Sequence, residues 1–179
     1  MAGHNKWVQI KHKKAVSDAK RSKIFSKMAR VIALESKKAA GDVTAPSLRA
    51  VIEKARSYNM PGDIIERNIK KGTGEGEVAL EAITYEAYAP GGVAIIIEAL
   101  TSNRNKASSE IKYILTEHGS SLGAIGSASW AFKKGETGWI AQIPVDVDEA
   151  TRAKIDDLID ALLNNDEVQM VYTTLKISL

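Results

Sequence analysis

The chain has 179 residues, of which 44% are hydrophobic and 26% charged, and it contains no cysteine. This composition is typical of a globular protein with a buried core, and it excludes a disulfide framework and a thiolate zinc site. No run of about 18 apolar residues is present and the N-terminus lacks the apolar stretch of a signal peptide, so we expect a cytoplasmic protein that makes no contact with a membrane.

Charge divides the chain into two parts. Residues 1–71 contain 17 basic and 6 acidic side chains, a net charge of +11, whereas residues 72–179 contain 8 and 16, a net charge of −8. Basic residues are densest in the first 38 positions, which hold eleven of them against two acids. Such a cluster repels itself and gains when a polyanion replaces its counterions, so it predicts a nucleic-acid contact. The alternative is a solvated helix face, but such faces usually interleave both signs.

Residues 1–14 show no helical period, and we expect them to form an extended basic arm that is mobile when unbound. Its candidate nucleic-acid contacts are Gly3, His4, Lys6, Trp7, Lys11, His12, Lys13 and Lys14. The sequence leaves two interpretations of Trp7 open, because an indole among lysines can stack on a base or ribose or can anchor the arm to the first helix.

Three amphipathic helices are predicted after the arm. The first begins near Val16 and ends at Gly41, and the second begins at residues 44–46, where Thr44 is the expected cap. The third runs to about Lys71, with Gly72 as its expected C-cap. Since none can bury its apolar stripe alone, they should form a small bundle. Its candidate nucleic-acid contacts are Lys20, Arg21, Lys23, Lys27, Arg67, Lys70 and Lys71.

Residues 72–77 alternate glycine with acidic residues and predict a flexible hinge. A phosphate-binding loop is the poorer interpretation, because no Gly-Lys-Ser/Thr follows and the acids would repel phosphate. We therefore expect one domain over residues 1–76, made of the arm and the bundle, and a second over residues 77–179.

The second domain changes to the period of strands. The predicted order is strands at 83–88 and 93–100, a helix at 102–118, strands at 129–132 and 139–143 around a turn at 133–138, a helix at 148–164 and a strand at 168–177. This order indicates an α+β sandwich close to the ferredoxin-like, or split βαβ, pattern. Tyr88, Trp139 and Tyr172 are expected to cover its core, and a protein-binding surface is the alternative.

Catalytic chemistry is not indicated. The three histidines have no cysteine or acidic pair beside them, and the serine pairs lack the motif of a strained nucleophile turn. We expect no enzyme activity, no cofactor, no metal site and no small-molecule substrate.

Several blocks of the sequence resemble the YebC family of bacterial and organellar proteins. The N-terminal signature is carried by residues 1–7, 10–14, 18–21 and 23–25. Further blocks are residues 59–61, 65–67, 69–74, 85–86, 90–94, 103–105, 118–119, 122–123, 126–127, 168–169 and 171–172. Two positions depart from the family pattern: Ser120 replaces a usual glycine, and residues 133–148 are too few for the small α/β domain that members typically carry there.

The resemblance implies a non-enzymatic regulator of gene expression, with two roles associated with the family. One is a translation factor that acts on ribosomes and assists synthesis of difficult, notably proline-rich, stretches. The other is a DNA-binding transcriptional regulatory protein. We favour ribosomal RNA and the ribosome as partners, because an irregular cationic arm with a tryptophan suits unpaired, stackable bases. A bundle helix could enter a DNA major groove, yet none presents an evident set of Arg, Asn and Gln for base edges.

Overall fold

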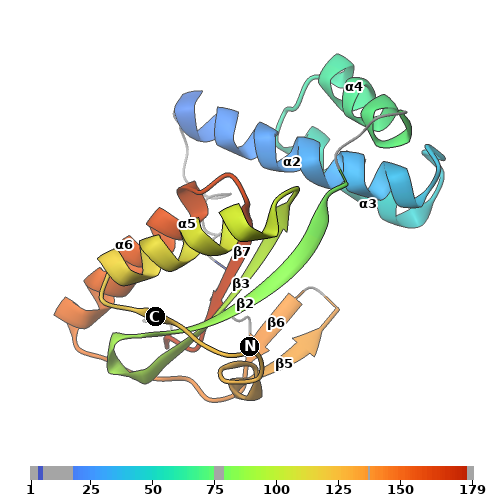
Figure 1. The fold of residues 1–179 in the computed structure, drawn as a ribbon. Helices are drawn as coiled ribbons and strands as arrows, with labels where there is room; N and C mark the ends of the chain where they lie inside the picture. The colour runs from blue at the N-terminus through green and yellow to red at the C-terminus, as the bar shows by residue number, and fades with distance from the viewer. Residues whose placement is uncertain (1–3, 6–17, 75–78, 137, 177–179) are drawn as a thin grey trace. The chain divides into compact units, whose positions relative to one another are not determined.

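The computed structural model describes residues 4–5, 18–74, 79–136 and 138–176 (Figure 1). These residues form two compact units. One unit is helical and lies within Ala15–Glu81, and the other is an α+β unit that contains residues from Ala82 onward together with a short strand near the N-terminus.

The helical unit consists of α2 (Asp18–Lys38), α3 (Pro46–Ser57) and α4 (Gly62–Thr73), which confirms the three predicted helices. Their apolar stripes are buried as the periodicity indicates. Each fully buried Leu or Ile contributes about 1.5–3 kcal/mol relative to exposure, so packing of the stripes supplies most of the stability of these short helices. The buried apolar side chains are Ile24, Met28, Ile32, Ala33, Leu48, Ile52, Ala55, Met60 and Ile65.

The start of α3 differs from the prediction. The expected cap, Thr44, instead donates from both its N–H and its hydroxyl to Oδ1 of Asp42, at 2.9 and 2.7 Å. The N-cap position is Ala45, which makes no side-chain cap bond, and Pro46 follows in the first turn. The Thr44 hydroxyl and N–H lower the pKa of Asp42, since both bonds favour its charged form.

Gly72 is also placed differently, because α4 continues through it to Thr73. Gly72 is buried against α2, where an added Cβ would overlap the carbonyl oxygen of Ala33 and lie 2.7 Å from Cβ of Ser36. One turn earlier, the Ser36 hydroxyl donates to the carbonyl of Ile69 at 2.7 Å. Gly72 is therefore a close-packing residue between two helices. The predicted hinge lies partly outside the described residues, since 75–78 are not described.

The α+β unit contains one five-stranded sheet and one hairpin. The sheet has the order β1-β7-β3-β2-β4, and the hairpin pairs β5 with β6 in antiparallel fashion. The elements are β1 (His4–Asn5), β2 (Glu81–Ala89), β3 (Val93–Thr101), α5 (Arg104–Glu117), β4 (Ser121–Leu122), β5 (Phe132–Gly135), β6 (Gly138–Ala141), α6 (Glu149–Asn164) and β7 (Val168–Thr173).

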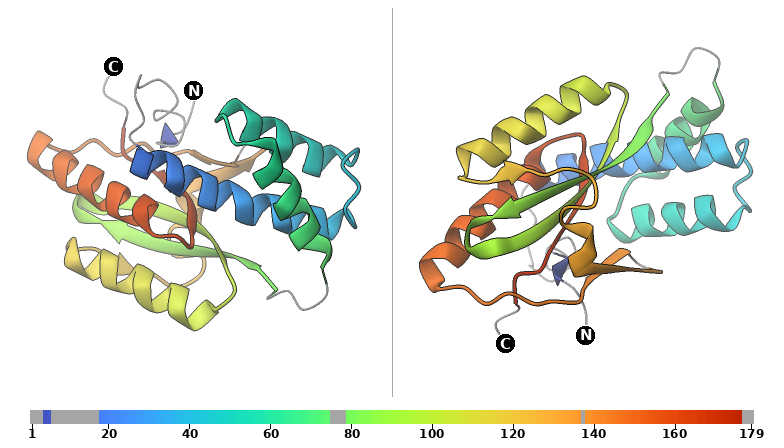
Figure 2. Two further views of the ribbon diagram at one scale, coloured as in Figure 1. Left: turned by 90° about the horizontal axis from the view of Figure 1, so that it is seen from above. Right: turned by 60° about the horizontal axis from the view of Figure 1, so that its bottom comes forward.

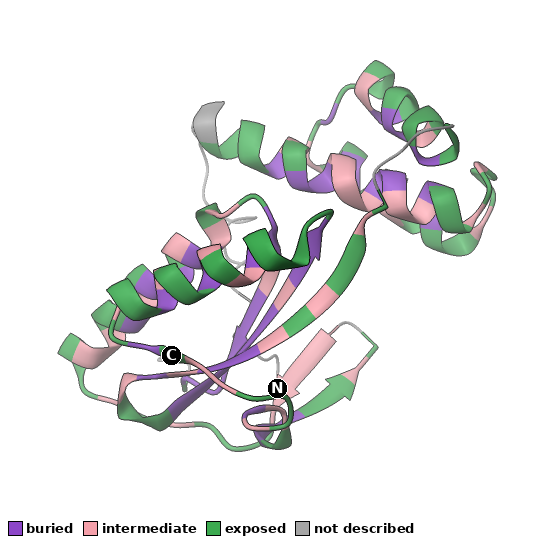
Figure 3. Ribbon diagram, viewed as in Figure 1, coloured by how far each residue is buried: buried purple, intermediate pink, exposed green. Residues whose placement is uncertain are grey.

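Strand β3 is the centre of the unit because both of its faces are covered (Figure 3). Val93, Ile95 and Ile97 pack in the cluster that includes the buried residues of α5 and α6. Ala94 and Ile96 belong to a second cluster with side chains of the β5–β6 hairpin. The layers are thus two helices, the sheet and the hairpin (Figure 2), and the α+β fold class is confirmed.

Three predicted boundaries of the second domain are wrong. Residues 129–131, predicted as a strand, form a 3-10 turn, and β5 occupies part of the predicted turn at 133–138. The last strand ends at Thr173 rather than at residue 177. The Ser129 N–H is bound by a side chain of β2, which bends the chain before β5 begins.

β1 corrects the predicted domain division. His4 and Asn5 pair antiparallel with Thr173 and Tyr172 of β7, so this strand joins the α+β unit and not the bundle. The pairing covers backbone groups that β7 would otherwise present at the edge of the sheet. The other arm residues, 1–3 and 6–14, lie outside the described residues, so the prediction that the arm is mobile is not tested.

A half-buried acid, Glu98, attaches the hairpin to the sheet. Glu98 of β3 accepts from Nε1 of Trp139 at 3.0 Å and from the Tyr172 hydroxyl at 3.4 Å. Burial raises the pKa of Tyr172 well above its usual range, and the negative charge and hydrogen bond of Glu98 raise it further. Tyr172 is buried, and Trp139 and Tyr88 pack half-buried against the same cluster, so the three aromatics cover the core as expected.

Candidate nucleic-acid interface

Three of the predicted contacts, Lys20, Arg21 and Lys23, are exposed near the N-terminal end of α2. The N–H groups at the start of a helix create a partial positive charge, so cations there are unfavourable for the helix itself. The helix dipole therefore does not favour Lys20 and Arg21, which lie in the first turn. A bound polyanion would compensate both the cations and the helix terminus.

A second group, Arg67, Lys70 and Lys71, is exposed on α4. The spacing of three and four residues puts the three side chains on one side of the helix, opposite the buried Ile65. Within the described part of the chain, their side chains make no ion pair. Lys70 and Lys71 lie in the last turn, where the helix dipole favours cations, so this group also has an ordinary structural explanation.

Lys27 does not belong to either group. Its side chain is only 2% exposed, so it is not available to a phosphate. The reason is its position on the helix: Lys27 is three residues after Ile24 and next to Met28, both of which are buried. The prediction of Lys27 as a surface contact is therefore wrong.

The arm contacts are not placed by the structure. Gly3, Lys6, Trp7, Lys11, His12, Lys13 and Lys14 lie outside the described residues, and only the backbone of His4 is described. Their nucleic-acid contacts stay a prediction from the sequence, as do the two interpretations of Trp7.

The α+β unit contains an exposed loop that the sequence did not reveal. Glu86 of β2 is 7% exposed, and its carboxylate accepts three backbone N–H bonds from the segment before β5. Gly126 donates to Oε1 at 2.7 Å, while Ala128 and Ser129 donate to Oε2 at 2.6 and 2.7 Å. Burial alone would raise the pKa of Glu86, but these bonds and the Ser129 side chain lower it below the usual value. The acid is held charged and fixes the loop.

The same loop exposes two large apolar side chains, Ile125 and Trp130. The sequence prediction missed Trp130 because it placed the residue within a strand. The sequence did carry a signal for the loop itself. Ile125 lies between Gly123 and Gly126, and an apolar residue in a glycine-rich loop is rarely part of a core.

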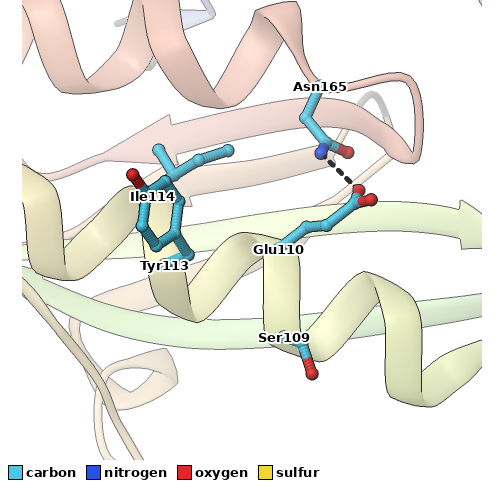
Figure 4. Close-up of a pocket in the computed structure, with 5 residues that line it drawn as sticks. All are labelled: Ser109, Glu110, Tyr113, Ile114 and Asn165. Atoms are coloured by element: carbon cyan, nitrogen blue, oxygen red, sulfur yellow. Dashed lines mark hydrogen bonds between the residues drawn. The ribbon is translucent and has the colours of Figure 1, made fainter.

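A shallow hollow of about 400 Å³ lies beside α5, lined by Ser109, Glu110, Tyr113, Ile114 and Asn165 (Figure 4). Asn165 Nδ2 donates to Glu110 at 2.8 Å, which links α5 to the residue after α6. Glu110 also forms an ion pair with Lys106, with 3.7 Å between Oε1 of Glu110 and Nζ of Lys106. These contacts are structural and bring no reactive pair together.

Among the described residues, no group of three His, Asp or Glu side chains could hold a metal ion. No described helix is both long and apolar enough to cross a membrane.

Comparison with known families gives two matches that together cover most of the chain. Residues 5–75 match the TACO1/YebC protein N-terminal domain, and residues 80–135 match the TACO1/YebC second and third domain. The second match ends at the last residue of β5. Between β5 and α6, the described residues form only β6 and a connecting segment.

Several known proteins are similar to this chain over nearly its whole length. The chain is 47% identical over 185 residues to a probable transcriptional regulatory protein of Thermosipho melanesiensis, covering 99% of this chain and 72% of that protein. It is 50% identical over 175 residues to one of Fervidobacterium nodosum, covering 96% and 69%. A crystal structure of the conserved hypothetical protein Aq1575 from Aquifex aeolicus aligns with a TM-score of 0.85 at 33% identity, covering 97% of this chain and 98% of that one.

Proposed function

The chain belongs to the TACO1/YebC family, and from this premise we propose that it is a nucleic-acid-binding regulator of gene expression that acts on the ribosome. In this role it binds ribosomal RNA and assists translation of difficult, notably proline-rich, stretches. The proposal includes no catalytic step.

The observation that carries the proposal is the group Lys20, Arg21 and Lys23 at the start of α2. Lys20 and Arg21 lie in the first turn of the helix, where the dipole opposes cations, and Lys23 follows them in the next turn. A stretch with four further lysines, residues 1–14, precedes all three. A surface that is unfavourable in the unbound protein and favourable against phosphates is typical of a polyanion site.

The preference for RNA over DNA depends on which side chains are available to contact the bases. Sequence-specific DNA binding needs side chains such as Arg, Asn and Gln on one helix face that enters a groove. On α4 the exposed basic face is Arg67, Lys70 and Lys71, while Asn68 is buried and donates to the carbonyl of Ile64 at 2.8 Å. Such a face can bind phosphates but offers little base readout, which favours folded RNA with unpaired bases.

The test compares two sets of substitutions in α2. Replacing Lys20, Arg21 and Lys23 by Ala should weaken co-sedimentation with ribosomes and flatten the salt dependence of binding to a single-stranded RNA by about 2 in log–log slope, since each phosphate contact contributes about 0.7. Lys37→Ala with Lys38→Ala is the matched control, because these lysines are exposed at the other end of the same helix. An equal effect per substituted residue in the two sets, or no association of the wild-type chain with ribosomes at low salt, would contradict the proposal.

The second candidate is the role that the relatives' names state, transcriptional regulation. It requires that the chain prefer one duplex sequence over bulk competitor DNA by at least about a thousandfold. A competition titration against random duplex measures this ratio. Binding without preference rejects this candidate and leaves the ribosome proposal in place.

A further inference from the structure

Two of the most exposed large apolar side chains in the described residues belong to one loop. Ile125 is 96% exposed and Trp130 is 62% exposed, and both lie between β4 and β5. Exposing an isoleucine and an indole close together in the sequence has no benefit for folding. The loop is therefore a candidate contact surface of the α+β unit.

The loop is rigid despite its exposure. Three of its N–H groups are bound by the buried Glu86 carboxylate, and Gly123 N–H donates to the Glu86 carbonyl at 2.7 Å. A Cβ on Gly123 would overlap the Ser127 hydroxyl, so the turn is tightly packed. Ser127 N–H closes the turn by donating to Ala124 at 3.0 Å. A ligand of this loop would find it already ordered, which reduces the entropy lost on binding.

The indole of Trp130 is itself held in place. Its Nε1 donates to the carbonyl of Ser127 at 2.8 Å and to the Tyr88 hydroxyl at 3.0 Å. The Tyr88 hydroxyl in turn donates to the same Ser127 carbonyl at 2.6 Å. The only polar group of the ring is therefore satisfied within the protein. What Trp130 offers to a partner is the apolar surface of the ring, which suits stacking and not hydrogen bonding.

Charge near the loop differs from the rest of its unit. Residues 82–179 contain 13 acidic and 8 basic side chains, yet residues 118–135 contain no acid. This stretch ends with Lys133 and Lys134, whose side chains are exposed on β5. Lys134 also lies 5.4 Å from the centre of the Trp139 ring, so Lys133 is the cation without that aromatic contact. The carboxylate of Glu86, which holds the loop, is bonded to backbone amides.

These observations extend the proposed function, on which the inference rests. We propose that the loop of residues 123–131 binds an unpaired nucleobase of an RNA strand, with the base stacked on Trp130 and Lys133 beside the strand's phosphates. An ordered aromatic ring next to cations is the combination by which proteins hold single strands without reading sequence. A protein partner would need a broader apolar patch with several anchors, and the loop offers two side chains.

The test uses the full chain with a fluorescein-labelled adenylate RNA 10-mer and with an abasic strand of the same length. Trp130→Ala should weaken binding to the RNA about 5- to 150-fold, the equivalent of one lost stacking contact, and should leave abasic binding unchanged. Trp130→Phe should retain most of the affinity. The matched control is Tyr113→Ala, which removes an aromatic ring of similar exposure, 66%, on α5.

The outcomes separate this inference from the proposed function. If Trp130→Ala binds both strands as the wild type does, the stacking site is rejected, and a partner other than nucleic acid is left for the loop. If Trp130→Ala and Trp130→Phe weaken abasic binding as much as RNA binding, the residue acts through folding and the inference is equally rejected. Failure of the Lys20, Arg21 and Lys23 variants to change the salt slope rejects the proposed function, whatever Trp130 does. A deoxyadenylate strand that binds less tightly than RNA would identify RNA as the source of the base.

Discussion

The carboxylate of Glu86 accepts a hydrogen bond from the backbone N–H of Ala128 at 2.6 Å, although 42 positions separate the two residues. The same carboxylate accepts from the N–H of Gly126 at 2.7 Å and so connects two blocks that are far apart in the chain, residues 85–86 and 126–127. It explains why an acid occupies an otherwise buried position in β2, because the loop before β5 has N–H groups that need an acceptor.

Glu86→Gln should destabilise the α+β unit. The glutamine side chain has one acceptor oxygen in place of two, so at least one of the three N–H groups is left facing an amide NH₂ group. Leaving one buried N–H unsatisfied costs about 1–3 kcal/mol, measurable by urea unfolding. An unchanged unfolding midpoint would mean that the loop does not depend on this acid.

The same residue predicts a dependence on pH. The pKa of Glu86 is lowered in the folded protein, so its contribution is fully present above the ordinary glutamate pKa, about 4.3, and is lost as the pH falls through the folded-state value. We expect the free energy of unfolding to decrease between about pH 5 and pH 3 more steeply in the wild type than in Glu86→Gln. If the free energy of unfolding fell equally with pH in the two proteins, Glu86 would not be the source of the pH dependence.

Gly72→Ala tests the close approach of α4 to α2. The new methyl group would overlap the backbone of Ala33, and overpacking of this kind costs about 1–3 kcal/mol. Gly62→Ala is the control, because no atom lies within 4 Å of the added methyl at the start of the same helix. It should leave stability unchanged or raise it by about 0.4–1 kcal/mol. The melting temperature should therefore fall for Gly72→Ala and not for Gly62→Ala.

Lys27→Ala and Lys23→Ala should separate burial from nucleic-acid contact. Lys27 is only 2% exposed, so its removal should lower the melting temperature without changing the salt dependence of RNA binding. Lys23 is exposed, and its removal should flatten that dependence by about 0.7. The reverse pattern would show that Lys27 reaches the ligand.

Asn103 caps α5, since its side chain accepts from the N–H of Lys106 at 3.0 Å. Asn103→Ala should lower stability by about 0.5–2 kcal/mol, whereas Asn103→Asp should preserve the cap. Asn105→Ala is the neighbouring control inside the helix, where alanine is the better helix former, and it should be neutral or slightly stabilising. Equal losses for Asn103→Ala and Asn105→Ala would argue against the cap.

The sequence by itself determined the helices of the bundle, the central strand β3 and the unequal distribution of charge. These are local properties: Ile24, Met28 and Ile32 define a stripe at helical spacing, and the apolar run from Val93 to Leu100 is typical of a strand covered on both faces. The family blocks followed from the order of residues alone.

Only the tertiary structure decided which residues meet across long distances. It buried Lys27, made Gly72 a packing residue and not a cap, paired His4 and Asn5 with β7, and converted residues 129–131 from an expected strand into a turn. Each outcome depends on a partner distant in sequence, such as Ser36 for Gly72 or Glu86 for Ser129, and periodicity carries no information about such partners. The exposure of Trp130 has the same origin, because the bonds that hold it come from β2 and the preceding loop.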